Sequence, residues 1–197
     1  MRKISYTYDK KQGVISMETF HEASMNVYFI RHGQTDYSLK DHKIYQGFGV
    51  NLAPLSEEGI RQIEEAAKDP RLKDAELILT SPYTRAVQTA AILSRRLDLP
   101  IAVETDLHEW VANKHYIYEE NETAHKAFHE FMERNGEATE GALWESSEDI
   151  RQRVEAVLKK YRQYHKIIVA GHGYMIQAMT GVPHPDNGEI CFYQEKL

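Results

Sequence analysis

The chain is almost free of cysteine. Cys191 is its single cysteine in 197 residues, which excludes a disulfide framework and a cysteine-based zinc site. It lies in the run Ile-Cys-Phe-Tyr, a setting typical of a small apolar residue in a strand rather than of a reactive thiol. A chain of this length buries roughly 70 % of its unfolded surface and needs no covalent cross-link. Few cysteines also fit the reducing cytoplasm.

Long apolar runs and excess positive charge are missing too. No stretch approaches the roughly 18 apolar residues of a membrane span, and no apolar segment of a signal peptide follows Arg2 and Lys3. We therefore expect a cytoplasmic protein without a membrane partner. The net charge of −6 repels nucleic acid, which is not expected as a partner either. It also repels phosphate compounds, so any phosphate site must be a local positive pocket.

Hydrophobic patterning predicts strands that alternate with helices. Short apolar runs predict buried strands at Val27–Ile30, Leu77–Leu79, Ile101–Val103, Ile167–Ala170 and Ile190–Tyr193. Helices are expected from Ser56 to before Pro70, from Ser81-Pro82 to about Arg96, over about Ala124–Arg134, and from Asp149 to about Gln163. This order predicts an α/β fold, a three-layer sandwich whose mostly parallel central sheet has helices on both faces.

The domain organisation is expected to be simple. Residues 1–24 form an N-terminal extension, for which a hairpin and a partly ordered tail remain equally open, with a possible turn at Lys11-Gln12-Gly13. Residues 25–197 form one domain. The mixed segment at about 110–146 is expected to cover a pocket.

Polar residues follow three of the predicted strands. Arg31 and His32 come after the first, Ser81 leads from the second to Arg85, and His172 lies between two glycines after the fourth. The carboxyl ends of parallel strands meet at one edge of a sheet, where ligands bind. We therefore expect these residues to converge on one site.

The segment Arg31-His32-Gly33 carries the strongest chemical signal. An Arg-His pair directly after a buried strand is costly unless it is paired or functional. A neutral imidazole is a competent nucleophile toward phosphorus, and the guanidinium of Arg31 supplies a planar, permanently charged fork to phosphate oxygens. Gly33 leaves room for the backbone to approach a ligand.

A larger set of motifs surrounds this segment in a characteristic order. They are Arg31–Thr35, Gln46-Gly47, Leu52–Gly59, Ser81–Ala90, Leu107–Glu109 and Ala170–Gly173. The order resembles the histidine phosphatase (phosphoglycerate mutase-like) superfamily, from about Asn26 to Leu197.

The resemblance implies roles for the matching residues. His32 would become phosphohistidine, Arg31 and Arg85 would grip the transferring phosphoryl group, His172 would donate to its oxygens, and Glu109 would be the general acid and then the base. Substrate-binding positions would be Ser38, Gln46, Gly47 and Gly173. The implied partners are a small phosphorylated substrate and phosphate ion as product or inhibitor.

The implied roles place opposite electrostatic requirements on His32 and Glu109. Two nearby arginines should depress the pKa of His32 and keep it neutral. Glu109 needs a raised pKa, from substrate charge or from burial beside Trp110. The plainer alternatives are that Arg85 pairs with a helix carboxylate and that Glu109 is a surface group.

Cofactors are not expected. The sequence contains no P-loop and no G-x-G-x-x-G motif. His125 and His129 have a spacing that can bind metal, but a third ligand is not evident and a solvated helix face is favoured. No metal site is therefore predicted.

Two departures from the family pattern bear on function. Ser38 stands where many members have asparagine, and the run from Trp110 to Tyr116 differs from the loop that holds the carboxylate in mutases. Trp110, Lys114, His115 and Tyr116 are the candidates for specificity. A metal-independent phosphomonoesterase is the favoured function. The alternatives are a phosphoglycerate mutase-type phosphotransferase and a non-catalytic phosphate-binding or phosphoprotein-binding module.

Overall fold

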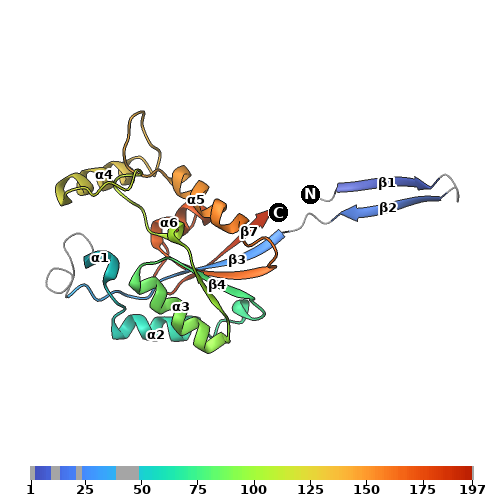
Figure 1. The fold of residues 1–197 in the computed structure, drawn as a ribbon, viewed down its shortest axis with the longest axis horizontal. Coiled ribbons are helices and arrows are strands. Elements are labelled where there is room, and N and C mark those ends of the chain that lie inside the picture. The colour runs from blue at the N-terminus through green and yellow to red at the C-terminus, as the bar shows by residue number, and fades with distance from the viewer. Residues whose placement is uncertain (1–2, 10–13, 21–23, 39–48, 197) are drawn as a thin grey trace.

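A five-stranded sheet forms the centre of the protein in the computed structural model, which describes residues 3–9, 14–20, 24–38 and 49–196. Its strands are β3 (Ser24–Arg31), β4 (Leu77–Thr80), β5 (Ile101–Val103), β6 (Lys166–Gly171) and β7 (Ile190–Lys196). They lie in the order β5-β4-β6-β3-β7, and every neighbouring pair is parallel except β3 and β7 (Figure 1). The predicted mostly parallel sheet is confirmed.

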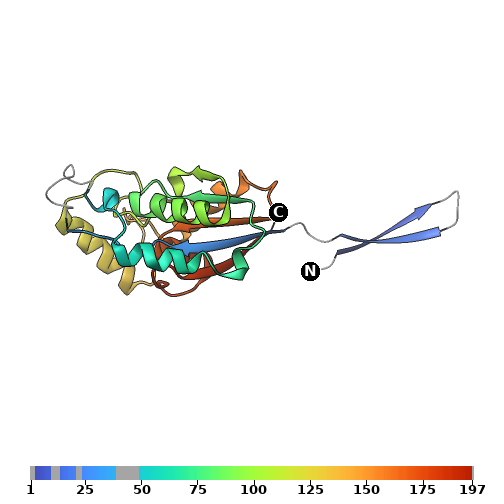
Figure 2. The same cartoon turned by 90° about the horizontal axis from the view of Figure 1, so that it is seen from below.

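Helices cover both faces of this sheet. Helices α2 (Glu57–Ala66) and α3 (Thr84–Leu97) cover one face, in front of the strands in Figure 2, and α5 (Ser147–Lys159) and α6 (Gly173–Thr180) cover the other. Alternate residues of β6 explain this arrangement, because Ile168 packs in the α2–α3 core whereas Ile167 and Val169 pack in the α5–α6 core. The three-layer sandwich is the result.

The predicted helix starts were correct for one helix and wrong for another. Ser56 caps α2, and its hydroxyl accepts from the Gly59 amide at 3.0 Å. Ser81 does not cap α3, which begins at Thr84 with Tyr83 as its N-cap. The Ser81 hydroxyl accepts from the amide of Tyr83 at 3.3 Å, in the turn before α3, and lies 2.7 Å from Nε2 of His172. It therefore bonds this turn and a histidine after another strand, and not the first turn of the helix.

The remaining helices differ in smaller ways from expectation. Helix α4 spans Asn121–Glu133, close to the prediction. Helix α5 begins two residues early, after a capping box between Ser146 and Asp149, and ends at Lys159 before the expected Gln163. Helix α6, the four-residue α1 (Gly49–Leu52), and the 3₁₀ turns η1 (Pro70–Leu72) and η2 (Thr105–Leu107) were not predicted.

The N-terminal extension contains two strands outside the central sheet. Strands β1 (Lys3–Asp9) and β2 (Val14–Phe20) pair antiparallel, with Lys3 opposite Phe20 and Asp9 opposite Val14. They form a two-stranded sheet of their own. The expected turn at Lys11-Gln12-Gly13 lies outside the described residues.

Cys191 behaves as the sequence predicted. It is a free, buried residue of β7, in the core between the sheet and α5–α6. Burial raises the pKa of its thiol to about 11, so the sulfur is protonated and inert at neutral pH. Among the described residues, no helix has the length and apolar character to cross a membrane.

Candidate active site

Three neighbouring strands deliver their polar residues to one edge of the sheet. His32 follows β3, His172 follows β6, and Ser81 follows β4, and these strands are adjacent in the sheet. The ring centroids of His32 and His172 are 5.2 Å apart. The convergence expected from the strand ends is therefore present.

The contacts of His32 define its tautomer. Nε of Arg85 donates to Nε2 of His32 at 3.1 Å, and Nδ1 lies 2.8 Å from the carbonyl oxygen of Gly33. Because Arg85 can only donate, Nε2 must hold the lone pair and Nδ1 must carry the proton. Burial and then the charge of Arg85 lower the pKa of His32 to about 3, with a smaller contribution from Arg31. The ring is neutral, as predicted, although burial rather than the arginines is the main cause.

The two arginines lie at this edge without an ion pair to any described carboxylate. Nη1 of Arg85 donates to the carbonyl oxygen of Val50 at 2.8 Å, and Nη1 of Arg31 donates to that of Pro185 at 2.6 Å. Arg85 is the second residue of α3, so the first-turn amides of that helix lie near its backbone. Its pairing with a helix carboxylate, the plainer alternative, is not observed among the described residues.

Two buried nitrogens in this region have no hydrogen-bond partner within the described part of the chain. They are Nε of Arg31 and Nδ1 of His172. The Ser81 hydroxyl can donate to Nε2 of His172, which leaves Nδ1–H of that ring as a free donor. Burial and the charge of Arg85 hold the pKa of His172 well below its usual range, so the ring is neutral. Unpaired buried donors beside the charged guanidinium of Arg85 are suited to an anionic ligand.

Close backbone packing shapes the loop that carries His32. A Cβ atom added at Gly33 would come within 2.3 Å of the carbonyl oxygen of Gly59, and one at Gly59 within 2.1 Å of that of Gln34. The loop therefore lies directly against the first turn of α2, and neither position has space for a side chain. The amide of Gly33 also donates to Oγ1 of Thr89 in α3 at 3.4 Å.

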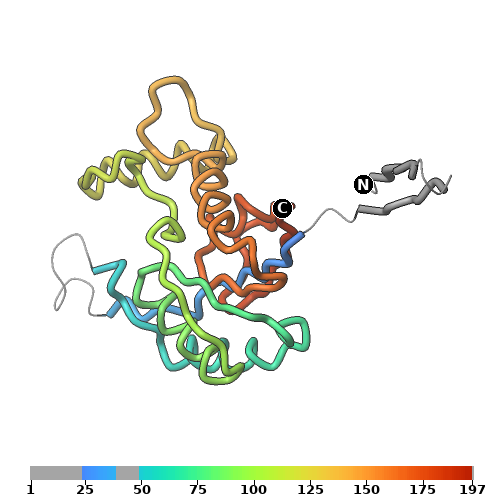
Figure 3. The backbone as a smooth tube through the Cα atoms, turned by 45° about the vertical axis from the view of Figure 1, so that its right-hand side comes forward, coloured from blue at the N-terminus to red at the C-terminus, as the bar shows by residue number. Residues whose placement is uncertain are grey.

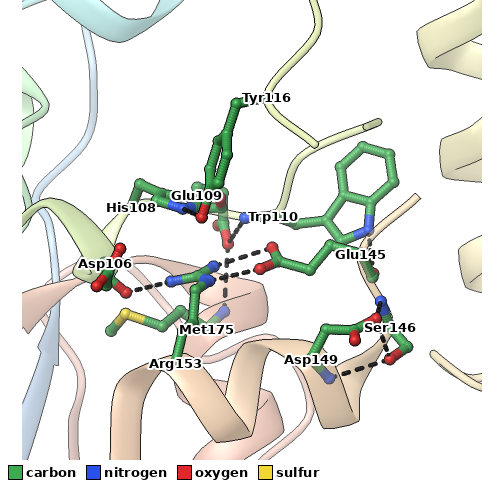
Figure 4. Close-up of polar contacts among 10 residues, drawn as sticks. All are labelled: Asp106, His108, Glu109, Trp110, Tyr116, Glu145, Ser146, Asp149, Arg153 and Met175. Carbon is green, nitrogen blue, oxygen red and sulfur yellow. Dashed lines mark hydrogen bonds and ion pairs between the residues drawn. The ribbon is translucent and has the colours of Figure 1, made fainter. Parts of the chain in front are cut away.

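Glu109 is bound to the start of α6. Its Oε1 accepts from the amides of Trp110 at 2.9 Å and Met175 at 3.2 Å (Figure 4). Its Oε2 accepts from the amide of Tyr174 at 3.3 Å. Burial nevertheless raises the pKa of this carboxyl, because its effect exceeds that of the amides and of the Arg85 charge, which lower the pKa. Glu109 is therefore not the surface group of the plainer alternative.

A buried ion pair holds the segment around Glu109. Arg153 of α5 forms two hydrogen bonds with the carboxylate of Glu145, from Nε to Oε1 and from Nη2 to Oε2, the latter at 3.0 Å (Figure 4). Nη1 of Arg153 donates to the carbonyl oxygen of Asp106. The indole of Trp110 donates to the backbone oxygen of Glu145 at 2.8 Å. Asp106, before Glu109 in the chain, is thus bound to Arg153 of α5, and Trp110, after Glu109, is bound to the backbone of Glu145.

The structure places the predicted substrate-binding and specificity residues in different surroundings. Gly173 is the first residue of α6, where a Cβ atom would come within 2.6 Å of the His184 ring. Ser38 is exposed, and its amide donates to Asp36 at 2.8 Å. Gln46 and Gly47 lie outside the described residues. Trp110 and Tyr116 line a cavity described below, whereas Lys114 and His115 do not.

Several side chains at this edge were not among the predicted site residues. The Tyr83 ring lies 5.2 Å from that of His172, and the Arg85 guanidinium lies 5.0 Å from the Tyr83 centroid. Nδ1 of His184 lies 3.3 Å from Nη1 of Arg31, and Asn187 donates to the His32 carbonyl oxygen at 2.7 Å. Tyr83 could have been found from its place after β4, two residues beyond Ser81. His184 and Asn187 come from a loop without any pattern.

Potential metal ligands are not grouped in the part of the chain that the structure describes. No cluster of three or more histidine, cysteine, aspartate or glutamate side chains is found there.

Comparison with known proteins connects this geometry to one family. The sequence model of the histidine phosphatase superfamily (branch 1) matches residues 27–182. The uncharacterized phosphatase PhoE of Bacillus subtilis (strain 168) is 28 % identical over 159 residues, or 78 % of this chain and 74 % of that protein.

Solved structures share the fold. A mycobacterial glucosyl-3-phosphoglycerate phosphatase with inorganic phosphate has a TM-score of 0.61 at 21 % identity, over 88 % of this chain and 95 % of that one. A phosphoglycerate mutase from Bacillus anthracis has a TM-score of 0.61 at 18 % identity, over 89 % of each chain. The family match spans well over half of the chain and includes every residue brought together at the sheet edge except the loop after Val182. The chain therefore belongs to the histidine phosphatase superfamily, branch 1.

Proposed function

We propose that the protein hydrolyses phosphomonoesters without a metal, through a phosphohistidine intermediate on His32. The observation that carries this proposal is the neutral His32 ring, whose Nε2 lone pair accepts from Arg85 in a region with unpaired donors on Arg31 and His172. Such an arrangement combines a nucleophile with positive charge and donors for the three equatorial oxygens of a phosphoryl group.

In the first step, Nε2 of His32 attacks phosphorus and forms the N–P bond while the bond to the alcohol oxygen breaks. Nε of Arg85, which donates to Nε2 in the free enzyme, then donates to a phosphoryl oxygen instead. Nδ1–H continues to donate its hydrogen bond to the carbonyl oxygen of Gly33, and this hydrogen bond stabilises the positive charge that the ring gains. Glu109 gives its proton to the leaving oxygen, and the raised pKa of its carboxyl favours the protonated form that this step needs.

In the second step, water attacks the phosphorus of phosphohistidine and passes a proton to Glu109. The N–P electrons return to Nε2, and phosphate leaves. The segment 110–146, whose two ends are joined by hydrogen bonds from Lys114 to Leu143 and from Trp110 to Glu145, is proposed to cover the pocket and carry specificity. Figure 3 traces this segment as a long excursion from the body of the domain before α5.

Hydrolysis can be separated from mutase activity by one assay. The protein is incubated with p-nitrophenyl phosphate and, separately, with 3-phosphoglycerate, from pH 5 to 8 with EDTA present. We expect release of phosphate that EDTA does not reduce, and slower interconversion of phosphoglycerates than hydrolysis. Interconversion faster than hydrolysis would establish a mutase. Phosphate-dependent stabilisation without turnover of any ester would establish a binding module.

Glu109→Gln should separate the acid role from other roles through the leaving group. We expect kcat/KM to fall about 10²- to 10³-fold for an alkyl phosphate, whose leaving oxygen needs a proton, and less than about tenfold for p-nitrophenyl phosphate. Because the acid must be protonated, the wild-type rate on the alkyl ester should decrease as pH rises through the raised pKa of Glu109, and the variant should lack this decrease. Equal losses on both esters, with an unchanged pH profile, would contradict the role.

A further inference from the structure

A cavity of about 810 Å³ lies beside the proposed phosphate site. It is bounded by Asn51 of α1, Ala124 of α4 and the segment that follows Glu109. Its size falls within the range of about 300–1,000 Å³ that is usual for small-molecule sites. The phosphoryl group itself would occupy the His32 region, so this volume is available to the rest of a substrate.

Tyr83 and Trp110 connect the cavity to the reacting groups. Tyr83 lines the cavity, and its ring lies 5.2 Å from that of His172, which in turn is 5.2 Å from that of His32. Trp110 also lines the cavity, and its amide donates to the carboxylate of Glu109. An alcohol that leaves from phosphorus at His32, on the side of Glu109, would therefore enter this cavity.

The wall of the cavity is organised by specific contacts. Buried Asn113 donates from Nδ2 to Glu119 at 2.7 Å and accepts the amide of His115 on Oδ1 at 3.0 Å. The hydroxyl of Tyr116 lies 3.3 Å from Nε2 of buried His108, directly before Glu109. The segment from 113 to 119 is thus attached to the residues that hold the proposed acid, which makes the cavity part of the same site.

The chemistry of the lining is aromatic and apolar with an acidic edge. The large aromatic and aliphatic lining residues are Tyr83, Trp110, Val111, Tyr116, Ile117 and Tyr118. The side chains of 116–118 are 65 %, 64 % and 58 % exposed, which leaves a row of large apolar groups available to a ligand. The charged residues in the described lining are Glu119 and Glu120, without lysine, arginine or histidine.

We propose that this cavity binds the alcohol portion of the substrate, and that this alcohol is aromatic or otherwise apolar and carries no negative charge. The inference rests on the proposed phosphatase function. Apolar groups gain from leaving water against Tyr83, Ile117 and Tyr118, whereas a carboxylate would meet Glu119 and Glu120 without a described cation to compensate it.

The test compares three esters with the full chain. The first two are 2-phenylethyl phosphate and ethyl phosphate, whose leaving alcohols have similar acidity, so a difference in kcat/KM reports binding of the phenyl group. The third is 3-phosphoglycerate, which places a carboxylate near the cavity. We expect kcat/KM for 2-phenylethyl phosphate to exceed those for both other esters by at least about tenfold.

A pair of variants links this preference to the cavity. Ile117→Asp places a carboxylate on the exposed wall and should reduce the ratio of the phenylethyl to the ethyl ester several-fold. Met132→Asp changes a 47 % exposed residue of α4 outside the lining and should leave that ratio unchanged.

The outcomes separate the two proposals. His32-dependent hydrolysis of ethyl and 2-phenylethyl phosphate at similar kcat/KM would overturn the substrate inference and leave the phosphatase function standing. Preference for 3-phosphoglycerate would do the same. Hydrolysis of p-nitrophenyl phosphate but of none of these three esters would overturn the substrate inference alone, whereas absence of hydrolysis of all four esters by the wild type would overturn the phosphatase function and the inference with it.

Discussion

Replacing His32 by alanine is expected to lower kcat for p-nitrophenyl phosphate by at least about 10⁴-fold. The variant lacks Nε2, so the N–P bond cannot form, although Arg31, Arg85 and His172 still bind the phosphoryl group. Free wild-type enzyme should show no loss of kcat/KM from protonation of His32 between pH 5 and 8. The reason is that burial and Arg85 lower the pKa of this ring to about 3, and the neutral form dominates at every pH above that value.

The intermediate provides a second readout. Wild-type protein quenched during turnover should carry a phosphoryl group that survives alkali and is lost in acid, as phosphohistidine is, and the variant should carry none. His165→Ala is the matched control, since the side chain of His165 is 91 % exposed, lies near Glu76, and precedes β6, whereas His172 follows that strand at its other end. Turnover by His32→Ala within tenfold of wild type would refute the nucleophile assignment.

The grouping of His32, Ser81, Arg85 and His172 could be predicted because it follows from strand topology. Each of these residues comes after a short apolar run, and parallel strands buried on both faces bring their carboxyl ends to one edge. The tautomer of His32 could not be predicted, since it depends on Nε of Arg85 reaching Nε2. That contact requires the actual position of α3 above the sheet.

Predictions from local pattern failed where a tertiary contact competes for the same group. Ser81-Pro82 is a typical helix start, yet the Ser81 hydroxyl pairs with His172 and α3 begins at Thr84. Helix α6 was missed because it is eight residues long and almost uniformly apolar, so its sequence has no amphipathic period. Glu109 accepts hydrogen bonds from two amides of that helix, so the surroundings of its carboxylate could not be predicted either.

The ion pair between Arg153 and Glu145 could not be predicted from sequence patterns. Glu145 follows the expected helix of the mixed segment 110–146, in a stretch without periodicity, and Arg153 has the pattern of an ordinary exposed helix cation. The side chain of Glu145 is only 4 % exposed and that of Arg153 only 10 %. Their partners Asp106 and Trp110 come from a third part of the chain. Such a contact depends on how three segments pack together, so the pattern of any one segment does not predict it.

Replacing Arg153 by methionine is expected to lower the free energy of unfolding by about 3–5 kcal/mol. The variant leaves the carboxylate of Glu145 buried without its cation and removes the donor to the carbonyl oxygen of Asp106. For a domain of this size the loss corresponds to a decrease in Tm of roughly 6–20 °C, measurable by thermal unfolding. Arg151→Met on the same helix is the control, because Arg151 is 43 % exposed and its 3.7 Å pair with Glu148 contributes little.

The double variant Arg153→Met with Glu145→Leu distinguishes stability from positioning. Removing both charges eliminates the unpaired carboxylate, so much of the lost stability should return. The hydrogen bond to Asp106 does not return, and the segment that carries Glu109 therefore stays less constrained. We expect the double variant to approach wild-type Tm, while kcat/KM for an alkyl phosphate remains at least about tenfold low and that for p-nitrophenyl phosphate changes less. Recovery of both quantities together would assign the ion pair to stability alone, whereas the expected split makes Arg153 a positioning residue for the acid.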